Sequence, residues 1–344
     1  MKAAIIREHG PVENVTIATD LPVPEPGPDE VRLRVRAAAL NYLDIWVRNG
    51  WPGIKLSLPH ILGADAAGTI DALGANVRDW EIGARVAVDP TLSCGECEFC
   101  RAGWENRCTR FAILGEHVSG TFAEYITIPA RNLIALPEHV SFAEAAAASL
   151  VFVTAWHSLI TRGNLRPGES VLVIGAGGGV NTASIQIAKL TGCTVYAVGS
   201  TDEKLKRAQA LGADAIIPRD VEGGWSRAVY QLTAKRGVDM VVDNVGGPTL
   251  NDSLRALARG GRVVTVGNTG GPKVEIDNRL VFGKHLSILG STMGPHRDYV
   301  RVMRLLFKGK LKAVIDATYP LDEVQTAMAR MEAGDLFGKA VLEL

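Results

Sequence analysis

The sequence predicts an α/β protein whose first part is rich in β-strands and whose second part contains a doubly wound parallel sheet. Up to about residue 130, short apolar stretches are separated by Gly and Pro, a pattern typical of strands joined by turns. From about Ser141, strand patterns alternate with helical patterns at the spacing of βαβ units. With 344 residues and 47% hydrophobic residues, the chain is long enough for two domains.

The first part begins with short, half-buried strand patterns. In "VRLRVRAAAL", Val31, Leu33 and Val35 alternate with arginines, as expected for a strand with one buried face. The stretches "KAAIIRE", "PHILGADAAGTIDALG", "GARVAVD" and "TFAEYITIP" continue this pattern. We interpret this part as a partly closed barrel.

The second part alternates helices and strands in chain order. The expected elements are a helix in "FAEAAAASLVFVTAWHSLI", a strand in "ESVLVIGAGGG", a helix in "NTASIQIAKLTG", a strand in "TVYAVGS", a helix in "TDEKLKRAQALG", a strand in "DAIIP", a helix from Trp225 to Arg236, a strand in "VDMVVDNVG", a helix in "LNDSLRALARGG" and a strand in "RVVTVGN". The last 50 or so residues lose this alternation.

The charge balance and the apolar segments restrict the class of partner. The chain has 37 basic and 37 acidic residues, which argues against a broad basic face for nucleic acid. The N-terminus has only a short apolar run before Arg7, and "AEAAAASLVFVTAW" is shorter than the roughly 20 residues of a membrane-spanning helix. We therefore expect a cytoplasmic protein that acts on a small molecule and binds neither nucleic acid nor membrane.

A glycine-rich turn predicts a dinucleotide site. The stretch "VLVIGAGGGVNTASIQIAK" places Gly175, Gly177, Gly178 and Gly179, followed by Val180, between a strand and a helix. Glycines let the backbone approach a pyrophosphate, and the helix N-terminus supplies unpaired N–H groups. A merely flexible turn is the alternative, which the surrounding βαβ pattern disfavours.

The end of the next strand bears on the choice between NADPH and NADH. The strand "TVYAV" is followed by Gly199 and Ser200, where an NAD site usually carries an acid for the ribose hydroxyls. Ser200, Lys204 and Arg207 suit a 2′-phosphate, which favours NADP(H).

Asp202 and Glu203 leave NAD(H) open as the alternative. We interpret them as first-turn acids of a helix that Ser200 or Thr201 caps, as in a capping box. If Asp202 points toward the cofactor instead, the nucleotide is NADH.

Four of the five cysteines lie in one short segment, at Cys94, Cys97, Cys100 and Cys108. The C-x2-C-x2-C-x7-C spacing supplies enough soft ligands to close a tetrahedral zinc site with no open position, so we expect one structural Zn²⁺ per chain. An iron–sulfur cluster or an empty loop is the alternative. Cys193, in "TGCTVY", is expected to be a small core residue.

These motifs together resemble the medium-chain dehydrogenase/reductase superfamily. The resemblance covers the whole chain and includes "PGPDEVRLRVRAAALN", "GTFAEY", the cysteine segment and "GADAII". It implies a GroES-like β-rich catalytic domain at 1–150, a Rossmann domain at 151–292 and a return to the catalytic domain at 293–344. It also implies an oxidoreductase that uses NAD(P)H.

The resemblance to the zinc alcohol dehydrogenases fails at the catalytic metal. Their Cys, His and Cys ligands correspond here to Asn41, Ala64 and about Leu150. Neither alanine nor leucine has a side chain that can bind a metal, so a catalytic zinc would lack its ligands.

The segment "ALNYLDIWVRNG" instead resembles the metal-free quinone oxidoreductases, in which an Asn begins the segment and an aromatic residue, here Trp46, follows. The glycine turn also has the length found in that branch. Asn181 occupies the position of its last glycine, and we expect Asn to tolerate a positive φ there.

A catalytic site without a metal requires hydrogen-bond donors for the charge that develops on oxygen, each of which contributes roughly 3 to 4 kcal/mol. The candidates are the Asn41 amide and the Tyr42 hydroxyl. Asp44 and Asp65 correspond to the acidic positions near the metal of relatives, and we expect them to be held by hydrogen bonds or by Arg48. A packing or turn role is the alternative for each of these residues.

The remaining candidates are positions expected to contact cofactor or substrate. The resemblance implies that Thr154 contacts the nicotinamide, and Trp46 and Trp51 are expected to wall a pocket for flat rings. Further cofactor contacts are expected from loops at the carboxyl ends of strands and from the C-terminal segment, at Asn244, Val266, Gly267, Asn268 and Lys339. A surface cation is the equal alternative for Lys339.

The function expected from these residues is hydride transfer from NADPH to a conjugated carbonyl or quinone without a catalytic metal. One alternative is an alcohol dehydrogenase with an unorthodox catalytic zinc that recruits Asp44, Asp65, His60 or His157. Another is an NADPH-binding sensor with little turnover. The apolar stretches "RVVTVG" and "LSILGS" indicate a homodimer or homotetramer.

Overall fold

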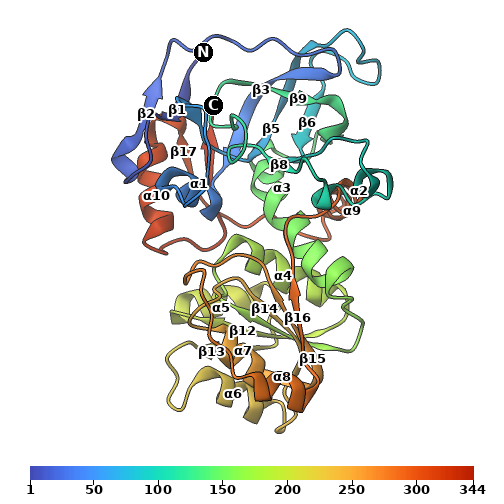
Figure 1. The fold of residues 1–344 in the computed structure, drawn as a ribbon, viewed down its shortest axis with the longest axis vertical. Helices are drawn as coiled ribbons and strands as arrows, with labels where there is room; N and C mark the ends of the chain where they lie inside the picture. The colour runs from blue at the N-terminus through green and yellow to red at the C-terminus, as the bar shows by residue number, and fades with distance from the viewer. The chain divides into compact units, whose positions relative to one another are not determined.

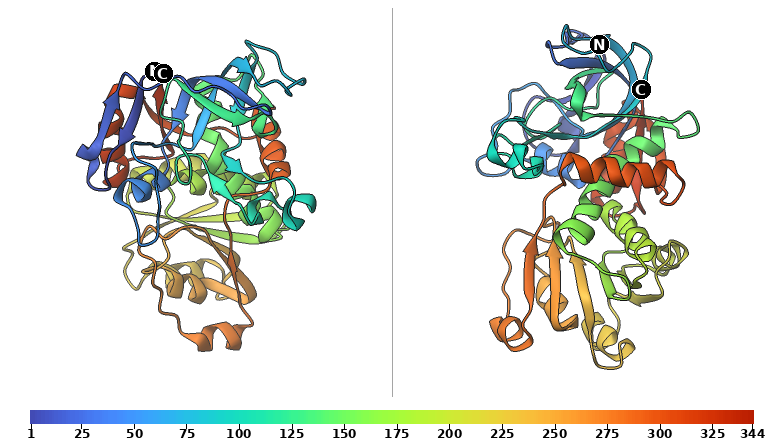
Figure 2. Two further views of the ribbon diagram at one scale, coloured as in Figure 1. Left: turned by 45° about the horizontal axis from the view of Figure 1, so that its top comes forward. Right: turned by 90° about the vertical axis from the view of Figure 1, so that its right-hand side faces the viewer.

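The computed structural model describes residues 1–344, which divide into two compact units. Unit 1 comprises residues 1–150 and 294–344, and unit 2 comprises residues 151–293. Each unit has its own sheet system (Figure 1). The two chain termini both belong to unit 1 and lie close together (Figure 2).

The main sheet of unit 1 carries the candidate catalytic residues. Its strands are ordered β10 (Leu133–Ala135), β6 (Arg85–Val88), β5 (Asp65–Leu73), β3 (Glu30–Ala39), β18 (Lys339–Glu343) and β17 (Ile315–Pro320), and β9 (Tyr125–Pro129) also pairs with β3. Strand β18 comes from the end of the chain, so the last residues complete a sheet that the first part begins.

The other strands of unit 1 form smaller sheets. One contains β2 (Val15–Ala18), β1 (Ala3–Ile6) and β4 (His60–Ile61), and the other contains β7 (Thr91–Leu92) and β8 (Ala112–Ile113). The α-helices are α1 (Tyr42–Asn49), α2 (Glu98–Arg101), α9 (His296–Phe307) and α10 (Val324–Glu332), and the 3-10 turns are η1 (Val12–Asn14), η2 (Glu105–Arg107), η3 (Ala130–Asn132) and η5 (Leu321–Glu323).

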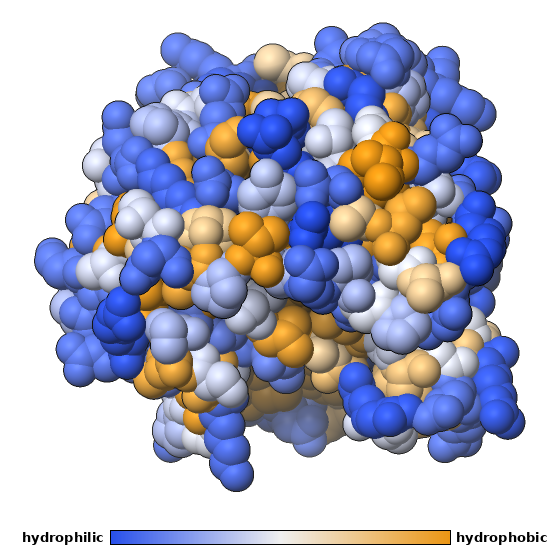
Figure 3. All heavy atoms as spheres, turned by 90° about the horizontal axis from the view of Figure 1, so that it is seen from above, coloured by the Kyte–Doolittle hydropathy of each residue, from blue (hydrophilic) through white to orange (hydrophobic).

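The core of unit 1 confirms the alternation predicted for β3. Val31, Leu33 and Val35 are buried, whereas the intervening arginines are not. Apolar residues of β5, β6, β9 and α10 pack against them. On the face of the molecule seen in Figure 3, apolar side chains are scattered among hydrophilic ones.

Unit 2 contains a parallel sheet of six strands with helices on both faces (Figure 2). The strand order is β13 (Ala215–Pro218), β12 (Thr194–Gly199), β11 (Ser170–Ile174), β14 (Val238–Asp243), β15 (Leu257–Thr265) and β16 (Ser287–Gly290). In chain order this is 3-2-1-4-5-6, which places the topological switch point between β11 and β14. The helices are α4 (Gly179–Leu190), α5 (Asp202–Ala210), α6 (Trp225–Leu232), α7 (Leu250–Ala256) and α8 (Asn278–Lys284).

One predicted helix is too long. We expected "LNDSLRALARGG" to be helical throughout, but α7 ends at Ala256 and Leu257 already pairs with Val238 of β14. A register shift in this pairing and the positive φ of Gly260 let the strand begin early. Tertiary pairing therefore overrides the local helical pattern.

One apolar helical stretch contains the boundary of the two units in the sequence. Helix α3 (Phe142–Trp156) leads into the π-helical turn η4 (His157–Arg162). The 21 residues of this stretch are long and apolar enough to cross a membrane by length and composition, but 78% of its most apolar window is buried inside the protein. Core helices of soluble proteins have the same properties.

Candidate active site

Neighbouring strands of unit 1 bring Asn41, Asp65 and Lys339 together. Asp65 at the start of β5 lies opposite Ala39 of β3, and Val341 of β18 lies opposite the same Ala39. Beyond this pair, the Leu40 N–H donates to the carbonyl of Ala340. The register of three adjacent strands therefore places residues from distant parts of the sequence at one end of the sheet.

The side chains of these three residues form a hydrogen-bonded cluster. Lys339 Nζ donates to Asn41 Oδ1 and lies 3.0 Å from Asp65 Oδ2. Asn41 Nδ2 donates to the same Asp65 oxygen at 2.9 Å and to the carbonyl of Ala39 at 3.4 Å. The other carboxylate oxygen of Asp65 accepts the N–H of Leu150 at 2.7 Å. All three side chains are buried, so Asp65 and Lys339 form a neutral ion pair away from bulk water.

This geometry corrects two expectations. Lys339 is not a surface cation, because it is only 4% exposed. Asn41 is not a free donor, because both N–H groups of its amide are directed at protein oxygens, those of Asp65 and Ala39. We therefore interpret Asn41 as a residue that orients its two charged neighbours.

Asp44, in the first turn of α1, is a second buried carboxylate beside the cluster. Its oxygens accept the N–H of Asn41 at 2.7 Å and the N–H of Gly63 at 3.1 Å. Burial raises the pKa of Asp44 to about 7, although these backbone hydrogen bonds and the Lys339 charge oppose the shift. The expected link to Arg48 is wrong, because Arg48 Nη2 instead contacts the carboxylate of Glu332 at 3.0 Å.

The aromatic residues of α1 are partly exposed. The rings of Tyr42 and Trp46 meet edge to face, with centroids 5.4 Å apart. Trp51 is 39% exposed. A donor role for Tyr42 and a pocket-wall role for Trp46 and Trp51 stay predictions.

In unit 2, the glycine turn lies at the switch point of the sheet. Gly175, directly after β11, has φ +86°, which explains the need for glycine at this position. Gly178 is the N-cap of α4, which begins at Gly179 and includes Val180. The N-terminal N–H groups of α4 are thus presented where a pyrophosphate binds in this type of sheet.

Asn181 has a role that the sequence did not reveal. The expected positive φ is wrong, because Asn181 is helical and its amide donates to the carbonyls of Ile174 and Gly175. Its Oδ1 accepts from the amide of Asn244, which follows β14. Asn181 therefore ties together the two strand ends that flank the switch point.

Asn244 provides a test of whether this site fits a cofactor. Its Oδ1 is buried and has no hydrogen-bond donor within the protein. A buried acceptor without a partner is costly, and a ligand amide or hydroxyl would satisfy it. The adjacent Asp243 is fully engaged, since it accepts from two backbone N–H groups and from the hydroxyls of Thr249 and Ser253. The residues here thus fit a dinucleotide.

The loops after β14 and β15 contact each other. The Val266 N–H lies 3.4 Å from the carbonyl of Asp243, and Gly270 donates to Val245 at 2.7 Å. Gly267 has φ +99° and is followed by Asn268. Thr154 lies in α3 and donates to the sulfur of Met293 at 3.6 Å. Their contacts to nicotinamide stay predictions.

The cavity beyond β12 differs in charge from our expectation. It has a volume of about 250 Å³ and is lined by Gly199, Ser200, Thr201, Asp202, Leu205, Pro218, Asp220 and Val221. Two carboxylates and no cation therefore line this space. Lys204 and Arg207 are not among the lining residues, and Arg207 instead lies 3.9 Å from Glu203.

The cap of α5 is largely as predicted. Thr201 is the N-cap, its hydroxyl accepts the N–H of Lys204, and Asp202 and Glu203 lie in the first turn. The capping box itself is wrong, because Lys204 occupies the third helical position where the box requires Glu or Gln. Asp202, the first residue of the helix, lines the cavity.

The four cysteines form a compact cluster in unit 1. Their Sγ atoms lie within 4.8 Å of one another, and neighbouring pairs are separated by 3.5–3.9 Å. A tetrahedral zinc with Zn–S bonds of about 2.3 Å requires S–S separations of about 3.8 Å. The cluster therefore fits a closed zinc site. All five cysteines are free thiols, and Cys193 is buried as expected.

The surroundings of the cysteines favour a thiolate at Cys94 and disfavour one at Cys100. The N–H groups of Glu96 and Cys97 lower the pKa of Cys94 to about 5, whereas burial raises the pKa of Cys100 to about 12. The N–H of Arg110 also donates to Cys108 Sγ at 3.2 Å. N–H···S bonds of this kind neutralise part of the charge of a thiolate site.

Contacts outside the metal site attach the cysteine lobe to α9. His296 Nδ1 lies 2.9 Å from Asp89 Oδ2, and the ring of Trp104 contacts the guanidinium groups of Arg107 and Arg297 at 4.3 and 4.1 Å. Sequence reasoning did not find these residues, because they come from segments about 200 positions apart.

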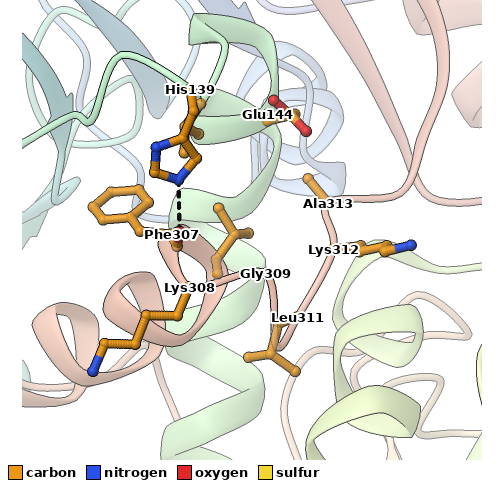
Figure 4. Close-up of a pocket in the computed structure, with 10 residues that line it drawn as sticks. His139, Glu144, Phe307, Lys308, Gly309, Leu311, Lys312 and Ala313 are labelled. Carbon is orange, nitrogen blue, oxygen red and sulfur yellow. Dashed lines mark hydrogen bonds between the residues drawn. The ribbon is translucent and has the colours of Figure 1, made fainter.

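A further cavity in unit 1, of about 590 Å³, lies between the start of α3 and the end of α9 (Figure 4). His139 Nε2 contacts the carbonyl of Phe307 at 2.8 Å across it. Lys308 and Lys312 extend from its rim. At the start of α3, the Ser141 N–H donates to the carboxylate of Glu144, and the Glu144 N–H donates to the Ser141 hydroxyl. None of the predicted site residues lines this cavity.

The unorthodox zinc site is not found. The cysteine cluster is the only group of three or more His, Cys, Asp or Glu side chains arranged to hold a metal. The carboxylates of Asp44 and Asp65 accept hydrogen bonds from backbone N–H groups, and His60 Nε2 lies 2.9 Å from the carbonyl oxygen of Gly115. His157 belongs to unit 2.

Comparison with known proteins places the chain in a family. Residues 27–138 match the family described as "Alcohol dehydrogenase GroES-like domain", and residues 179–308 match "Zinc-binding dehydrogenase". The NAD-dependent alcohol dehydrogenase of Sulfolobus acidocaldarius is 31% identical over 351 residues, and the acryloyl-coenzyme A reductase of Sulfurisphaera tokodaii is 31% identical over 345 residues. Each match covers 100% of both chains.

A crystal structure of an NAD-dependent alcohol dehydrogenase superimposes with a TM-score of 0.96 at 45% identity, covering 100% of both chains. The chain therefore belongs to the medium-chain dehydrogenase/reductase superfamily. It is an NAD(P)-dependent oxidoreductase with a GroES-like domain and a Rossmann domain.

Proposed function

We propose that this protein reduces a conjugated carbonyl compound with hydride from NADH and without a metal at the reaction centre. The observation that carries this proposal is the position of the Lys339 ammonium. It lies against Asn41, which corresponds to one catalytic metal ligand in the zinc alcohol dehydrogenases, and against Asp65, which directly follows the position of a second, Ala64. A buried monocation there disfavours a divalent cation, and Ala64 and Leu150 offer no ligand atoms.

A conjugated carbonyl suits this site better than a simple ketone. The bound nicotinamide supplies the hydride. The protein must stabilise the negative charge that forms on oxygen. Conjugation delocalises part of this charge, so hydrogen bonds have less charge on oxygen to stabilise. The acryloyl-coenzyme A reductase relative is named for a substrate whose carbonyl is conjugated with a C=C bond.

The proposal of NADH rather than NADPH rests on the cavity beyond β12. Asp202 and Asp220 can accept hydrogen bonds from ribose hydroxyls, whereas a 2′-phosphate would face two carboxylates. The relatives named as NAD-dependent alcohol dehydrogenases support the same choice.

A nucleotide-oxidation screen tests the proposed function. Enones, quinones, an acryloyl thioester and simple aldehydes are supplied with NADH or NADPH, and loss of absorbance of the reduced nicotinamide is measured. We expect turnover with conjugated carbonyls and a kcat/KM for NADH at least about tenfold above that for NADPH. Tight nucleotide binding without turnover of any substrate would instead support the sensor alternative.

Asp202→Ser provides the matched variant for the nucleotide preference. We expect it to reduce the preference for NADH, because it removes one carboxylate from the cavity. Glu203→Ser, in the same helical turn but not lining the cavity, is the control and should leave the preference unchanged. Equal effects of both substitutions on the nucleotide preference would show that Asp202 does not bind the ribose hydroxyls.

We infer that two copies pair through β16. This strand is the edge of the sheet of unit 2, and Ile288 on it is 39% exposed. Phe282, in the preceding helix α8, is 65% exposed. An unprotected apolar edge can be satisfied by the same edge of a second copy about a twofold axis.

Ile288→Lys is expected to shift the protein from dimer to monomer in light scattering coupled to size exclusion, because it places a charge in the proposed interface. Leu232→Lys, at an exposed leucine in α6, is the control that should stay dimeric. A monomeric wild type, or a dimeric Ile288→Lys variant, would contradict this interface.

A further inference from the structure

We propose that Lys339 is a catalytic residue that donates a hydrogen bond to the substrate oxygen on which negative charge develops. This inference rests on the proposed function, since it names the group that stabilises charge in a carbonyl reduction. It assigns a chemical role to a residue for which the sequence indicated a cofactor contact or a surface cation.

Lys339 has one more N–H donor than its two side-chain acceptors use. An ammonium group carries three N–H bonds. One is directed at Asn41 Oδ1 and one at Asp65 Oδ2, and no protein acceptor faces the third. A buried charged donor is normally satisfied, so the third N–H marks a position where a ligand oxygen completes the set.

The Lys339 ammonium group is held in place by its neighbours. Lys339 begins β18, and its backbone N–H donates to the carbonyl of Val314 at 2.8 Å. Its head group is fixed by two acceptors, of which Asp65 is itself held by the Leu150 N–H. The donor is therefore preorganised, which is the condition under which hydrogen bonds lower a reaction barrier.

The other candidate donors near the cluster are less suitable than Lys339. Both N–H groups of the Asn41 amide already have acceptors. The carboxylate of Asp65 has no hydrogen to donate. Tyr42 is uncharged and partly exposed. Lys339 is the remaining fixed donor, and hydrogen bonds from a cation are about twice as strong as those between neutral groups.

The chemical step balances with Lys339 as a donor that keeps its proton. Hydride from NADH forms a C–H bond at the β-carbon of the enone, and the electron pair of the C=C bond moves toward oxygen to give an enolate. The Lys339 N–H stabilises this oxygen. A proton from water then forms the second C–H bond at the α-carbon, so that the substrate is reduced and NADH is oxidised to NAD⁺.

The competing explanation is that Lys339 only neutralises Asp65. The two roles separate in the variants Lys339→Met, Asp65→Asn and the double variant. If Lys339 only neutralises Asp65, the double variant removes both charges and should recover activity toward that of Asp65→Asn. If Lys339 is the donor, the double variant should stay as slow as Lys339→Met.

We expect kcat of Lys339→Met and of the double variant to fall by about 100- to 1,000-fold, as for loss of an oxyanion donor. The KM for NADH should stay within about threefold, because the loss is confined to stabilisation of the transition state. NADH affinity and thermal unfolding of each variant confirm that the protein is folded. Lys284→Met is the matched control, because Lys284 donates only to backbone carbonyls of unit 2 and should keep wild-type kcat.

The possible results are distinct. A wild-type protein that turns over no carbonyl overturns the proposed function and this inference with it. An active wild type with Lys339→Met within threefold of its kcat overturns the inference alone. Recovery of kcat in the double variant to more than about tenfold above that of Lys339→Met also overturns the inference.

Discussion

Replacing Cys108 by serine is expected to abolish zinc binding and to destabilise unit 1. Cys108 is buried, and its sulfur accepts the N–H groups of Cys94 and Arg110, so the whole loop is organised around it. A serine hydroxyl is a poor zinc ligand, and structural zinc contributes directly to folding, by about 10–16 kcal/mol in zinc-finger peptides. We expect zinc to fall from about one to near zero per chain and Tm to fall by at least roughly 10 °C.

Elemental analysis and calorimetry on the same sample check this expectation. Cys193→Ser is the control, since Cys193 is also buried but lies in unit 2, where its thiol donates to the carbonyl of Arg166. The Cys193→Ser variant should keep its zinc. Iron with visible absorption in the wild type would instead indicate a cluster, and zinc retained in Cys108→Ser would show that the cysteines do not form the site.

The second large effect concerns the pH dependence of stability. The pKa of Asp44 rises from 3.8 to about 7 on folding because of burial. The folded protein thus binds this proton more tightly than the unfolded chain does. The resulting stabilisation is fully present below about pH 3.8 and is lost as pH rises through about 7, at up to about 1.4 kcal/mol per pH unit.

Asp44→Asn should remove this dependence, since an amide does not titrate. The free energy of unfolding of the wild type, relative to Asp44→Asn, is expected to fall between pH 4 and 7 by up to about 4 kcal/mol in total. Denaturant titrations across this range measure the difference. Parallel curves for the two proteins would show that Asp44 is ionised throughout.

Asp214→Asn is the matched control for this experiment. Burial of Asp214 would raise its pKa, but hydrogen bonds from Lys189 and from the Val195 N–H lower it below 3.8 overall. Its contribution to stability is therefore present above about pH 3.8 and is lost only as the pH falls through the lower, folded-state pKa. The difference between Asp214→Asn and the wild type should consequently be constant between pH 5 and 8.

Features encoded by local spacing could be predicted from the sequence. The four cysteines lie within one loop, and their close spacing already indicated a tetrahedral set. The glycine turn lies between a strand and a helix in the sequence and does so in the structure. The alternation in β3 gave its buried face, because side chains of a strand alternate whatever lies around it.

Features that depend on pairing between distant segments could not be predicted. The register of β18 against β3 brings Lys339 to Asn41, a separation of 298 residues. The hydrogen bond from Asn244 to Asn181 likewise spans the switch point, so Asn181 resembled a substituted glycine in the sequence. Asp202 lines the same cavity as Pro218, the last residue of β13, and Asp220, and no local pattern in the sequence brings these residues together.

We propose above all that protein groups, with Lys339 foremost, take the place of the catalytic metal of related enzymes. Zinc content and turnover of a conjugated carbonyl, measured on one sample before and after brief treatment with a chelator, test it most directly. The account predicts about one zinc per chain, bound by the cysteines, with turnover that does not depend on any additional metal. A second equivalent of zinc, whose removal abolishes turnover while the cysteine-bound zinc stays in place, would contradict it.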